Sequence, residues 1–168
     1  MNTNLRLDVN VLDAKNIIKW LRNKDVTKFL NEDKNSAAVL EYLIETGQAD
    51  LLTYHLNKNS RFFLIDTPEE DCVGFITLFT ISHMQEYEVV IAIGDPKNWG
   101  KKIGYSALKS ILHKVFFGWR INKLVAKIHI ENERSINLFK HLSFKNNGVK
   151  NYHVIFSITF DEYLNSLK

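Results

Sequence analysis

The feature that most constrains this fold is an apolar run, followed at once by a turn rich in glycine and lysine and then by a helical pattern. The run covers residues 89–93 and the turn covers residues 98–104. Apolar side chains then recur at helical spacing on one face, at Ile103, Ala107, Leu108, Ile111, Leu112 and Val115. The sequence therefore predicts a strand that leads through a short turn into a helix packed on the core.

Such a turn aims successive backbone N–H groups and the positive end of a helix dipole at one point, which suits a phosphate. Lys101 and Lys102 add positive charge, and Gly100 and Gly104 let the backbone approach an anion closely. For this segment alone, an ordinary strand-to-helix connection with two solvated lysines is an equally good interpretation. The rest of the chain has to decide between them.

Composition places the chain among globular proteins. It has 168 residues, of which 45% are apolar and 24% charged, and we expect a single domain over residues 1–168. No apolar run is long enough to span a bilayer, and the first residues lack the form of a signal peptide. Cys72 is the single cysteine, which excludes an internal disulfide. We therefore expect a cytoplasmic protein that does not associate with a membrane.

The small positive charge could serve an anionic cofactor or a nucleic acid and does not decide between them, and the histidine spacing gives no sign of a metal site. The net charge of +3 is small and the lysines form no basic block. The six histidines are dispersed without the spacing of metal ligands. We expect no metal and no nucleic-acid partner.

Periodicity and turn signals predict a mixed α/β (α+β) fold. Asp13 and Ser36 are the expected N-caps of the first two helices. Residues 49–58 are ambiguous between a short helix and a loop. The predicted strands cover residues 5–9, 61–66, 73–79, 86–93, 124–128, a segment from 144 and 153–160, and the other predicted helices cover 104–117 and 132–142.

Three segments together resemble one family. Residues 88–108, with Trp99-Gly100-Lys101-Lys102-Ile103-Gly104, resemble the cofactor motif of the GNAT N-acetyltransferases. The similarity is to the branch of ribosomal-protein-alanine, polyamine and amino-sugar acetyltransferases. Residues 132–144 resemble the second family signature, and residues 19–30 resemble its first-helix region. The family usually has glycine where this chain has Lys102 and Ser143, and a side chain at 102 implies either an ordinary φ or mild strain.

The resemblance implies a fold and an activity. The fold would be a central mixed, mostly antiparallel sheet of about seven strands flanked by about four helices. The activity would be transfer of an acetyl group from acetyl-CoA to a primary amine, by direct attack in a ternary complex and without a metal. A homodimer is common in the family and is expected here.

The resemblance also assigns residues to the cofactor. The backbone of Ile91 and Ile93 would pair with the pantetheine arm, and Asn132 would contact a pantetheine amide. The side chains of Ile91 and Ile93 would belong to the core whether or not the strand backbone binds the cofactor. The pyrophosphate turn would be formed by Asn98, Trp99, Gly100, Lys101, Lys102, Ile103, Gly104 and Tyr105.

Two residues are candidates for proton transfer. Glu88 could take a proton from the amine, directly or through water, or only attract an ammonium group. A solvent-facing carboxylate beside Glu86 is the structural alternative. Ser135 is the candidate acid near the leaving sulfur, because many family members have tyrosine where this chain has Phe139. Alternatively, no dedicated acid exists, since a thiol is a good leaving group with a pKa of roughly 8.5.

The acceptor site is less well specified. In the family it is walled by the first two helices, where this chain has Trp20, Phe29 and Tyr42, although core packing is the more common role of such residues. Acceptor candidates are a small-molecule amine, an amino sugar, a polyamine or a protein N-terminus. An acidic pocket would favour a polyamine, and Glu32, Asp33 and Glu41 indicate one only faintly.

Two competing functions follow from the same residues. The missing tyrosine at 139 and glycine at 102 are compatible with a non-catalytic acyl-CoA-binding or sensor module on the same fold. The basic pI of about 8.9 is compatible with nucleic-acid binding that weakens with salt. Turnover of any amine would exclude the first of these.

Overall fold

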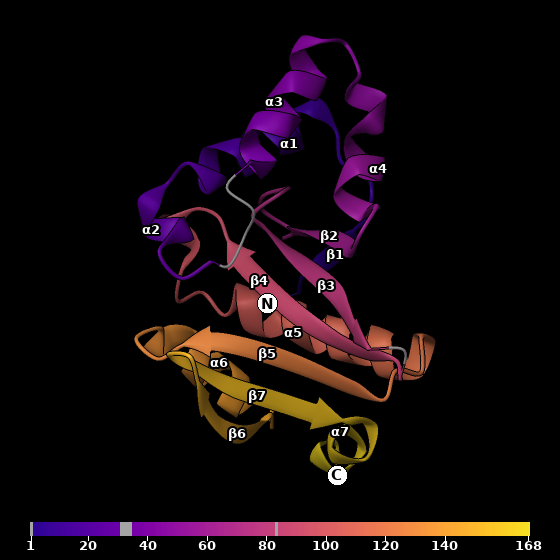
Figure 1. Ribbon diagram of the computed structural model, residues 1–168, viewed down its shortest axis with the longest axis vertical. Coiled ribbons are helices and arrows are strands. Elements are labelled where there is room, and N and C mark those ends of the chain that lie inside the picture. Colours follow the sequence, from indigo (N-terminus) through magenta and orange to yellow (C-terminus); the bar gives the residue numbers. More distant parts are fainter. Residues whose placement is uncertain (1, 31–34, 83) are drawn as a thin grey trace. The chain divides into compact units, whose positions relative to one another are not determined.

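The computed structural model describes residues 2–30, 35–82 and 84–168. Its strands form a seven-stranded sheet in the order β1-β2-β3-β4-β5-β7-β6 (Figure 1). The β4–β5 pair is parallel, whereas β1–β2, β5–β7 and β6–β7 are antiparallel. The predicted mixed, mostly antiparallel sheet is confirmed. The strands are β1 (Asn4–Arg6), β2 (Arg61–Asp66), β3 (Gly74–Ser82), β4 (Glu86–Ile93), β5 (Lys123–His129), β6 (Lys145–Lys150) and β7 (His153–Thr159).

The part of the chain that the structure describes holds seven α-helices, where about four were expected. The additional ones, α2, α4 and α7, are short. None of the described helices is long and apolar enough to cross a bilayer. The helices are α1 (Val11–Leu21), α2 (Lys24–Thr27), α3 (Ser36–Glu45), α4 (Leu52–Asn57), α5 (Ile103–His113), α6 (Glu133–His141) and α7 (Phe160–Ser166), with 3-10 turns η1 (Ala49–Leu51) and η2 (Pro96–Asn98) and a π-helical turn η3 (Lys114–Gly118) after α5.

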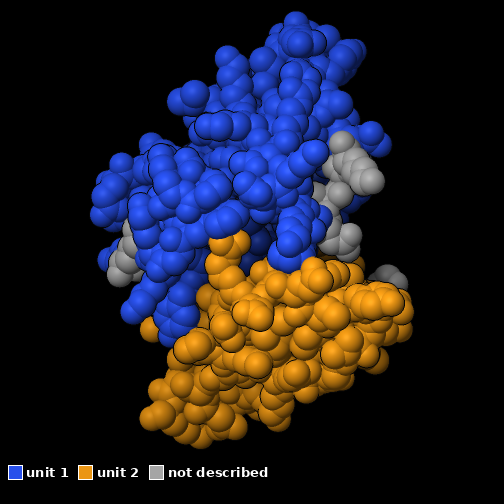
Figure 2. All heavy atoms as spheres, turned by 90° about the vertical axis from the view of Figure 1, so that its left-hand side faces the viewer, with its two compact units in different colours: residues 1–77, 90–107 blue, residues 78–89, 108–168 orange. Residues whose placement is uncertain are grey.

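The chain divides into two compact units, shown in different colours in Figure 2. The first unit contains residues 1–77 and 90–107, and the second contains residues 78–89 and 108–168. Strands β3 and β4 and helix α5 contribute residues to both. The single domain over the whole chain stays a prediction.

The first unit is built on a hydrophobic core between helices α1, α3 and α4 and the strands β2, β3 and β4. The helices supply one apolar face each, as their i, i+3, i+4 spacing predicts. On α3, Leu40 and Leu43 are buried, with Val39 and Ile44 packed beside them, which confirms the predicted face. The strands contribute Phe62, Leu64, Phe75 and Ala92, and the turn before β3 contributes Cys72.

A buried ionic cluster joins the N-terminal strand to this core. The Arg6 guanidinium donates to Asp13 on α1 (2.8 Å) and to Asp66 on β2 (3.0 Å). Burial alone would raise the pKa of Asp13, but hydrogen bonds from Arg6 and from the backbone of Asn10 outweigh it and lower the pKa. The pKa of Arg6 is raised by the same contacts. The cluster therefore holds its charges while fixing β1 against α1 and β2.

Three local predictions in this unit were wrong in detail. Asn10, not Asp13, is the N-cap of α1, and Asp13 is the N3 partner in a capping box. Asn35, not Ser36, precedes α3 as its N-cap and makes no side-chain cap bond. Strand β1 covers Asn4–Arg6 alone, because the chain must turn after Arg6 to begin α1 at Val11.

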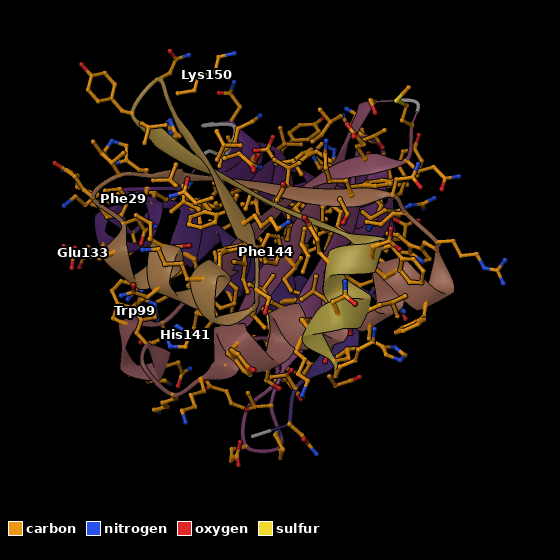
Figure 3. All side chains as sticks on the ribbon, turned by 90° about the horizontal axis from the view of Figure 1, so that it is seen from below. Phe29, Trp99, Glu133, His141, Phe144 and Lys150 are labelled. Atoms are coloured by element: carbon orange, nitrogen blue, oxygen red, sulfur yellow. The ribbon has the colours of Figure 1, made fainter. Side chains whose placement is uncertain are left out.

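The second unit is centred on the long antiparallel pair β5–β7, in register from Lys123 opposite Thr159 to His129 opposite His153. On β5, the alternating residues Leu124, Ala126 and Ile128 are buried. The same unit contains a cluster of aromatic side chains. Phe139 on α6 lies 4.9 Å from Phe144 and 6.3 Å from Phe156, measured between ring centroids. Phe144 is buried, and its label lies near the middle of the view in Figure 3. At the C-terminus, α7 adds a second aromatic contact, in which Tyr163 stacks on Phe116 at 5.1 Å.

Candidate functional site

The turn predicted to bind phosphate begins at the end of β4. After Ile93 and Gly94, the side chain of Asp95 accepts a hydrogen bond from the Lys97 backbone (3.0 Å) and caps η2. That hydrogen bond lowers the pKa of Asp95. The indole Nε1 of Trp99 donates to the Ile93 carbonyl (2.8 Å) and ties the turn back to the strand. These contacts hold the turn at a fixed place relative to β4.

Two residues of the turn have left-handed backbone conformations. Gly100 has φ +77° and Lys102 has φ +62°. A side chain at Lys102 is therefore mildly strained, which is one of the two outcomes expected for that position. The left-handed region costs a non-glycine residue about 1–2 kcal/mol. Lys102 thus has the backbone geometry that glycine adopts without cost.

Helix α5 begins at Ile103, immediately after the left-handed pair. The Lys102 carbonyl accepts the bond from the Ser106 N–H (3.1 Å). By helix geometry, the N–H groups of Ile103, Gly104 and Tyr105 have no intrahelical acceptor. With the dipole of an 11-residue helix behind them, these donors are suited to an anion.

Asn98 is the first residue of the turn and is buried, with 5% of its surface exposed. Its Nδ2 donates to Glu70 Oε2 (3.2 Å), and its Oδ1 accepts from Lys101 Nζ (3.1 Å). The side chain of Asn98, predicted to contact the cofactor, is thus engaged inside the protein. Sequence reasoning did not find Glu70, because it lies on the turn between β2 and β3.

The two isoleucines predicted to contact pantetheine lie on β4, where alternate side chains point to opposite faces. Ile91 and Ile93 are half-buried and share one face, whereas Ala92 points into the core of the first unit. The end of this strand is held to β3 by a bond from the Gly94 N–H to the Val73 carbonyl (2.9 Å).

Glu88 lies on β4 in the second unit, with its side chain 15% exposed. Its Oε2 forms an ion pair with Lys127 on β5. Glu86, two residues earlier on β4, pairs with Lys123 on β5 (2.7 Å), and that hydrogen bond lowers the pKa of Glu86. Both carboxylates therefore have a lysine partner, which the sequence did not reveal.

The other predicted groups of the second unit lie on α6. Asn132 is its N-cap, with its side-chain oxygen accepting from the Ser135 N–H (3.3 Å). Ser135 is half-buried in the first turns of the helix. Phe139 is 1% exposed and belongs to the aromatic core. Glu133, beside Asn132, is exposed and points outward in Figure 3.

The structure places the three predicted acceptor residues in different surroundings. Trp20 is buried in the core of the first unit. Phe29 is half-buried, with the Lys28 ammonium 4.7 Å from its ring centroid. Tyr42 on α3 is 59% exposed. Core packing therefore accounts for Trp20, while Phe29 and Tyr42 keep surface that another molecule can contact.

Of the three acidic residues that faintly indicated a polyamine pocket, the structure describes only Glu41. Glu32 and Asp33 lie outside the described residues. Glu41 on α3 forms a bidentate pair with Arg22, at 3.1 Å and 2.5 Å. Its negative charge is therefore partly balanced by a cation of the same unit.

The sequence profile of the acetyltransferase (GNAT) domain matches residues 5–145 of this chain. The protein belongs to the GNAT acetyltransferase family. Enzymes of this family use acetyl-CoA, so the chain is an N-acetyltransferase with acetyl-CoA as its donor.

Several known proteins resemble this acetyltransferase. Spermidine N(1)-acetyltransferase of Escherichia coli K12 is 25% identical over 141 residues, covering 78% of this chain and 73% of the relative. The spermidine N-acetyltransferase of Vibrio cholerae, solved in complex with CoA and spermine, has a TM-score of 0.75 at 20% identity, covering 98% and 99% of the two chains. The ribosomal-protein-S5-alanine acetyltransferase of Vibrio fischeri has a TM-score of 0.72 at 17% identity, covering 97% and 96%. At these identities the two solved structures establish the fold of this GNAT protein.

Proposed function

We propose that this acetyltransferase transfers the acetyl group of acetyl-CoA to a primary amine of a polyamine such as spermidine. The polyamine acceptor is supported by the curated relative, which matches over 78% of the chain and carries the name of a spermidine acetyltransferase. The observation that carries the cofactor assignment is the turn from Asn98 to Tyr105. Its left-handed Gly100 and Lys102 lead into the first turn of α5, where the N–H groups of residues 103–105 have no intrahelical acceptor.

The proposed cofactor site has a phosphate part and a pantetheine part. The N–H groups of Ile103, Gly104 and Tyr105 bind the pyrophosphate, and Lys101 and Lys102 add charge. The strand backbone at Ile91 and Ile93 pairs with the pantetheine arm, as an added strand would. Asn132 holds a pantetheine amide through the side chain that also caps α6.

The proposed reaction is a direct attack in a ternary complex. The lone pair of the neutral amine attacks the thioester carbonyl carbon, a C–N bond forms, and the C–S bond breaks as the tetrahedral intermediate collapses. Glu88 takes the proton that the nitrogen loses once the C–N bond has formed, directly or through one water. The departing thiolate takes a proton from water, either directly or relayed through the Ser135 hydroxyl, which regains its proton from that water, because Phe139 has no hydroxyl to supply one.

The ion pair of Glu88 with Lys127 has a consequence for the acceptor. A cationic polyamine that approaches Glu88 competes with the Lys127 ammonium for the same carboxylate. Lys127 is the more exposed partner, with its side chain 46% exposed, so it can swing into water at small cost. Glu88 then binds the substrate ammonium, which loses one proton to water to give the neutral amine. Glu88 takes the second proton after the nitrogen has attacked the thioester.

The acceptor is tested with a panel of amines and detection of the released CoA thiol. The panel contains spermidine, spermine, a diamine, an amino sugar and a peptide with a free N-terminus. We expect the highest kcat/KM for the polyamines. Turnover of the peptide or the amino sugar in preference to spermidine would reject the acceptor while keeping the enzyme.

The base is tested by Glu88→Gln, with Glu86→Gln as a matched control. Both variants remove a carboxylate from β4 that pairs with a lysine of β5. We expect Glu88→Gln to lower kcat by about 10²–10⁴-fold, the usual range for general base catalysis, and Glu86→Gln to leave it nearly unchanged. Equal effects of the two variants would reject Glu88 as the base.

The remaining assignments have their own tests. Gly104→Glu should abolish binding of CoA by placing a carboxylate at the phosphate, and Ser135→Ala should lower turnover if Ser135 supplies the proton to sulfur. Phe29 and Tyr42 are the proposed acceptor contacts. The homodimer and the cytoplasmic location stay predictions.

A further inference from the structure

A continuous series of contacts leads from the turn between β2 and β3 to the proposed phosphate turn. Glu70 Oε2 accepts from Asn98 Nδ2 (3.2 Å), and Asn98 Oδ1 accepts from Lys101 Nζ (3.1 Å). All of these residues belong to the first unit. We infer that Glu70 is a positioning residue for CoA binding, which orients Asn98 and through it places Lys101 at the phosphate turn. The inference rests on the proposed function.

The orientation follows from the hydrogen-bonding capacity of the three groups. An ionised carboxylate can only accept, so Asn98 must turn its NH₂ group toward Glu70. The amide oxygen then faces the Lys101 ammonium, which can only donate. Because Asn98 is buried, its amide cannot turn toward water instead. If Asn98 turned over, its NH₂ group would face the Lys101 ammonium.

Glu70 is itself held in place by its turn. Its backbone N–H donates to Thr67 Oγ1 (3.0 Å), and its carbonyl accepts from the Thr67 N–H (2.9 Å). Its second carboxylate oxygen accepts from Lys97 Nζ (3.2 Å). The hydrogen bond that Lys97 donates to Glu70 raises the pKa of Lys97. Both oxygens of the carboxylate therefore contact residues at the start of the phosphate turn.

If Glu70 acts by positioning Asn98 and Lys101, its removal should weaken CoA binding, whereas an effect of its charge alone would have the opposite sign. A carboxylate close to an anion site repels the anion, so its removal on charge alone would tighten CoA binding. If Glu70 orders Asn98 and Lys101, its removal releases a lysine with several rotatable bonds, and CoA binding must order that lysine again. The direction of the change therefore separates the two effects.

The test uses Glu70→Gln, with Glu69→Gln as the matched control. Glu69 lies in the same exposed turn, so both variants remove one negative charge from it. Binding of CoA is measured by calorimetry, and kcat and KM are measured with acetyl-CoA and with acetyl-pantetheine, which lacks the pyrophosphate. Because the relay consists of two part-buried hydrogen bonds, we expect Glu70→Gln to weaken CoA binding and to raise the KM for acetyl-CoA by about threefold to tenfold.

The other readouts should not change. We expect kcat with acetyl-CoA, and kcat/KM with acetyl-pantetheine, to stay within about twofold, because the relay acts on the phosphate turn alone. Glu69→Gln should leave all values unchanged. In an Asn98→Ala background, Glu70→Gln should cause no further loss, since the relay is already broken.

Three results would overturn the inference. The first is unchanged or tighter CoA binding by Glu70→Gln. The second is an equal loss with acetyl-pantetheine, which would indicate a general structural role. The third is a full additional loss in the Asn98→Ala background. Failure of the proposed function is recognised separately, because the unmodified protein would then not bind CoA, and that result overturns the inference as well.

Discussion

The indole of Trp20 lies against the backbone of Gly94 so closely that no side chain fits between them. A Cβ placed on Gly94 would lie 1.9 Å from Trp20 Cε2 and 2.0 Å from Cδ2. Trp20 is buried near the end of α1, and Gly94 directly follows the last residue of β4. This contact seats α1 on the end of the strand that leads into the proposed phosphate turn.

Gly94→Ala should therefore destabilise the protein. The added methyl group must displace a buried indole, and overpacking of this kind costs about 1–3 kcal/mol. Urea unfolding measures the free energy of unfolding. The cost should shrink in a Trp20→Leu background, where the ring is absent. If the two substitutions were additive, crowding against Trp20 would not be the cause.

Lys102→Gly should stabilise the protein relative to Lys102→Ala. Both variants remove the same charge, but alanine keeps the Cβ that is strained at φ +62°. Relief of this strain is worth about 1 kcal/mol once the greater freedom of glycine in the unfolded chain is subtracted. Thermal unfolding of the two variants measures the difference. A more stable alanine variant would contradict the left-handed conformation.

Ser143 allows the strain of a left-handed backbone conformation to be tested at a position that carries no charge. It has φ +64° and lies just after α6, where the resembling family also has glycine. Ser143→Gly should raise the free energy of unfolding above that of Ser143→Ala by about 1 kcal/mol. Because Ser143 belongs to no proposed binding site, CoA affinity should stay the same in both variants. A change in affinity would reject the proposed boundaries of the cofactor site.

Asp13 should make stability depend on acid pH. Its pKa in the folded protein is lower than its ordinary value of 3.8. Its contribution is therefore present above about pH 4 and is lost as the pH falls through the folded-state pKa. Asp13→Asn should cost about 1–3 kcal/mol at pH 7 and progressively less as the pH falls below about 4, as measured by urea unfolding. The exposed Asp8→Asn is the control, and a pH-independent cost would contradict the ion pair with Arg6.

Lys127→Gln should lower the KM for spermidine if the polyamine competes with Lys127 for Glu88. The substitution keeps a side chain of similar length and removes the competing charge. We expect a decrease of about twofold to fivefold, the usual scale for a partly exposed ion pair. Lys123→Gln, which removes the partner of Glu86, is the control. An unchanged KM would mean that the substrate ammonium does not contact Glu88.

Elements with unambiguous periodicity could be predicted with their bounds. Strands β2 and β4 begin and end at the predicted residues, because both are rich in β-branched and aromatic side chains and contain no glycine or proline. Residues 49–58 remained ambiguous because the helix there has six residues, too few for a clear period.

Helix ends were harder to place. In α1, Asn10 and Asp13 are both good N-cap residues, and the capping box uses both of them, so residue preference alone could not separate their roles. Helix α7 was missed, although its signal is present. Thr159, the last residue of β7, and Glu162 form a second capping box, which the alternation of that strand masked.

The site could be predicted only where it follows from neighbouring residues. The phosphate turn is contiguous, so its position could be read from residues 98–105. The partners of the site residues come from distant parts of the chain. Glu70 is 28 residues from Asn98, and Lys127 is 39 residues from Glu88. Such pairs depend on strand register and on turn geometry, which a single sequence does not specify.

The buried state of Cys72 makes the enzyme convenient to assay. It is the single cysteine of the chain, and burial is the main cause that raises the pKa of its thiol to about 12. At the neutral to mildly alkaline pH of a thiol-detecting assay, the folded protein therefore presents almost no reactive thiolate. A colorimetric thiol reagent would report the CoA released at each turnover, with a background that rises only when the protein unfolds.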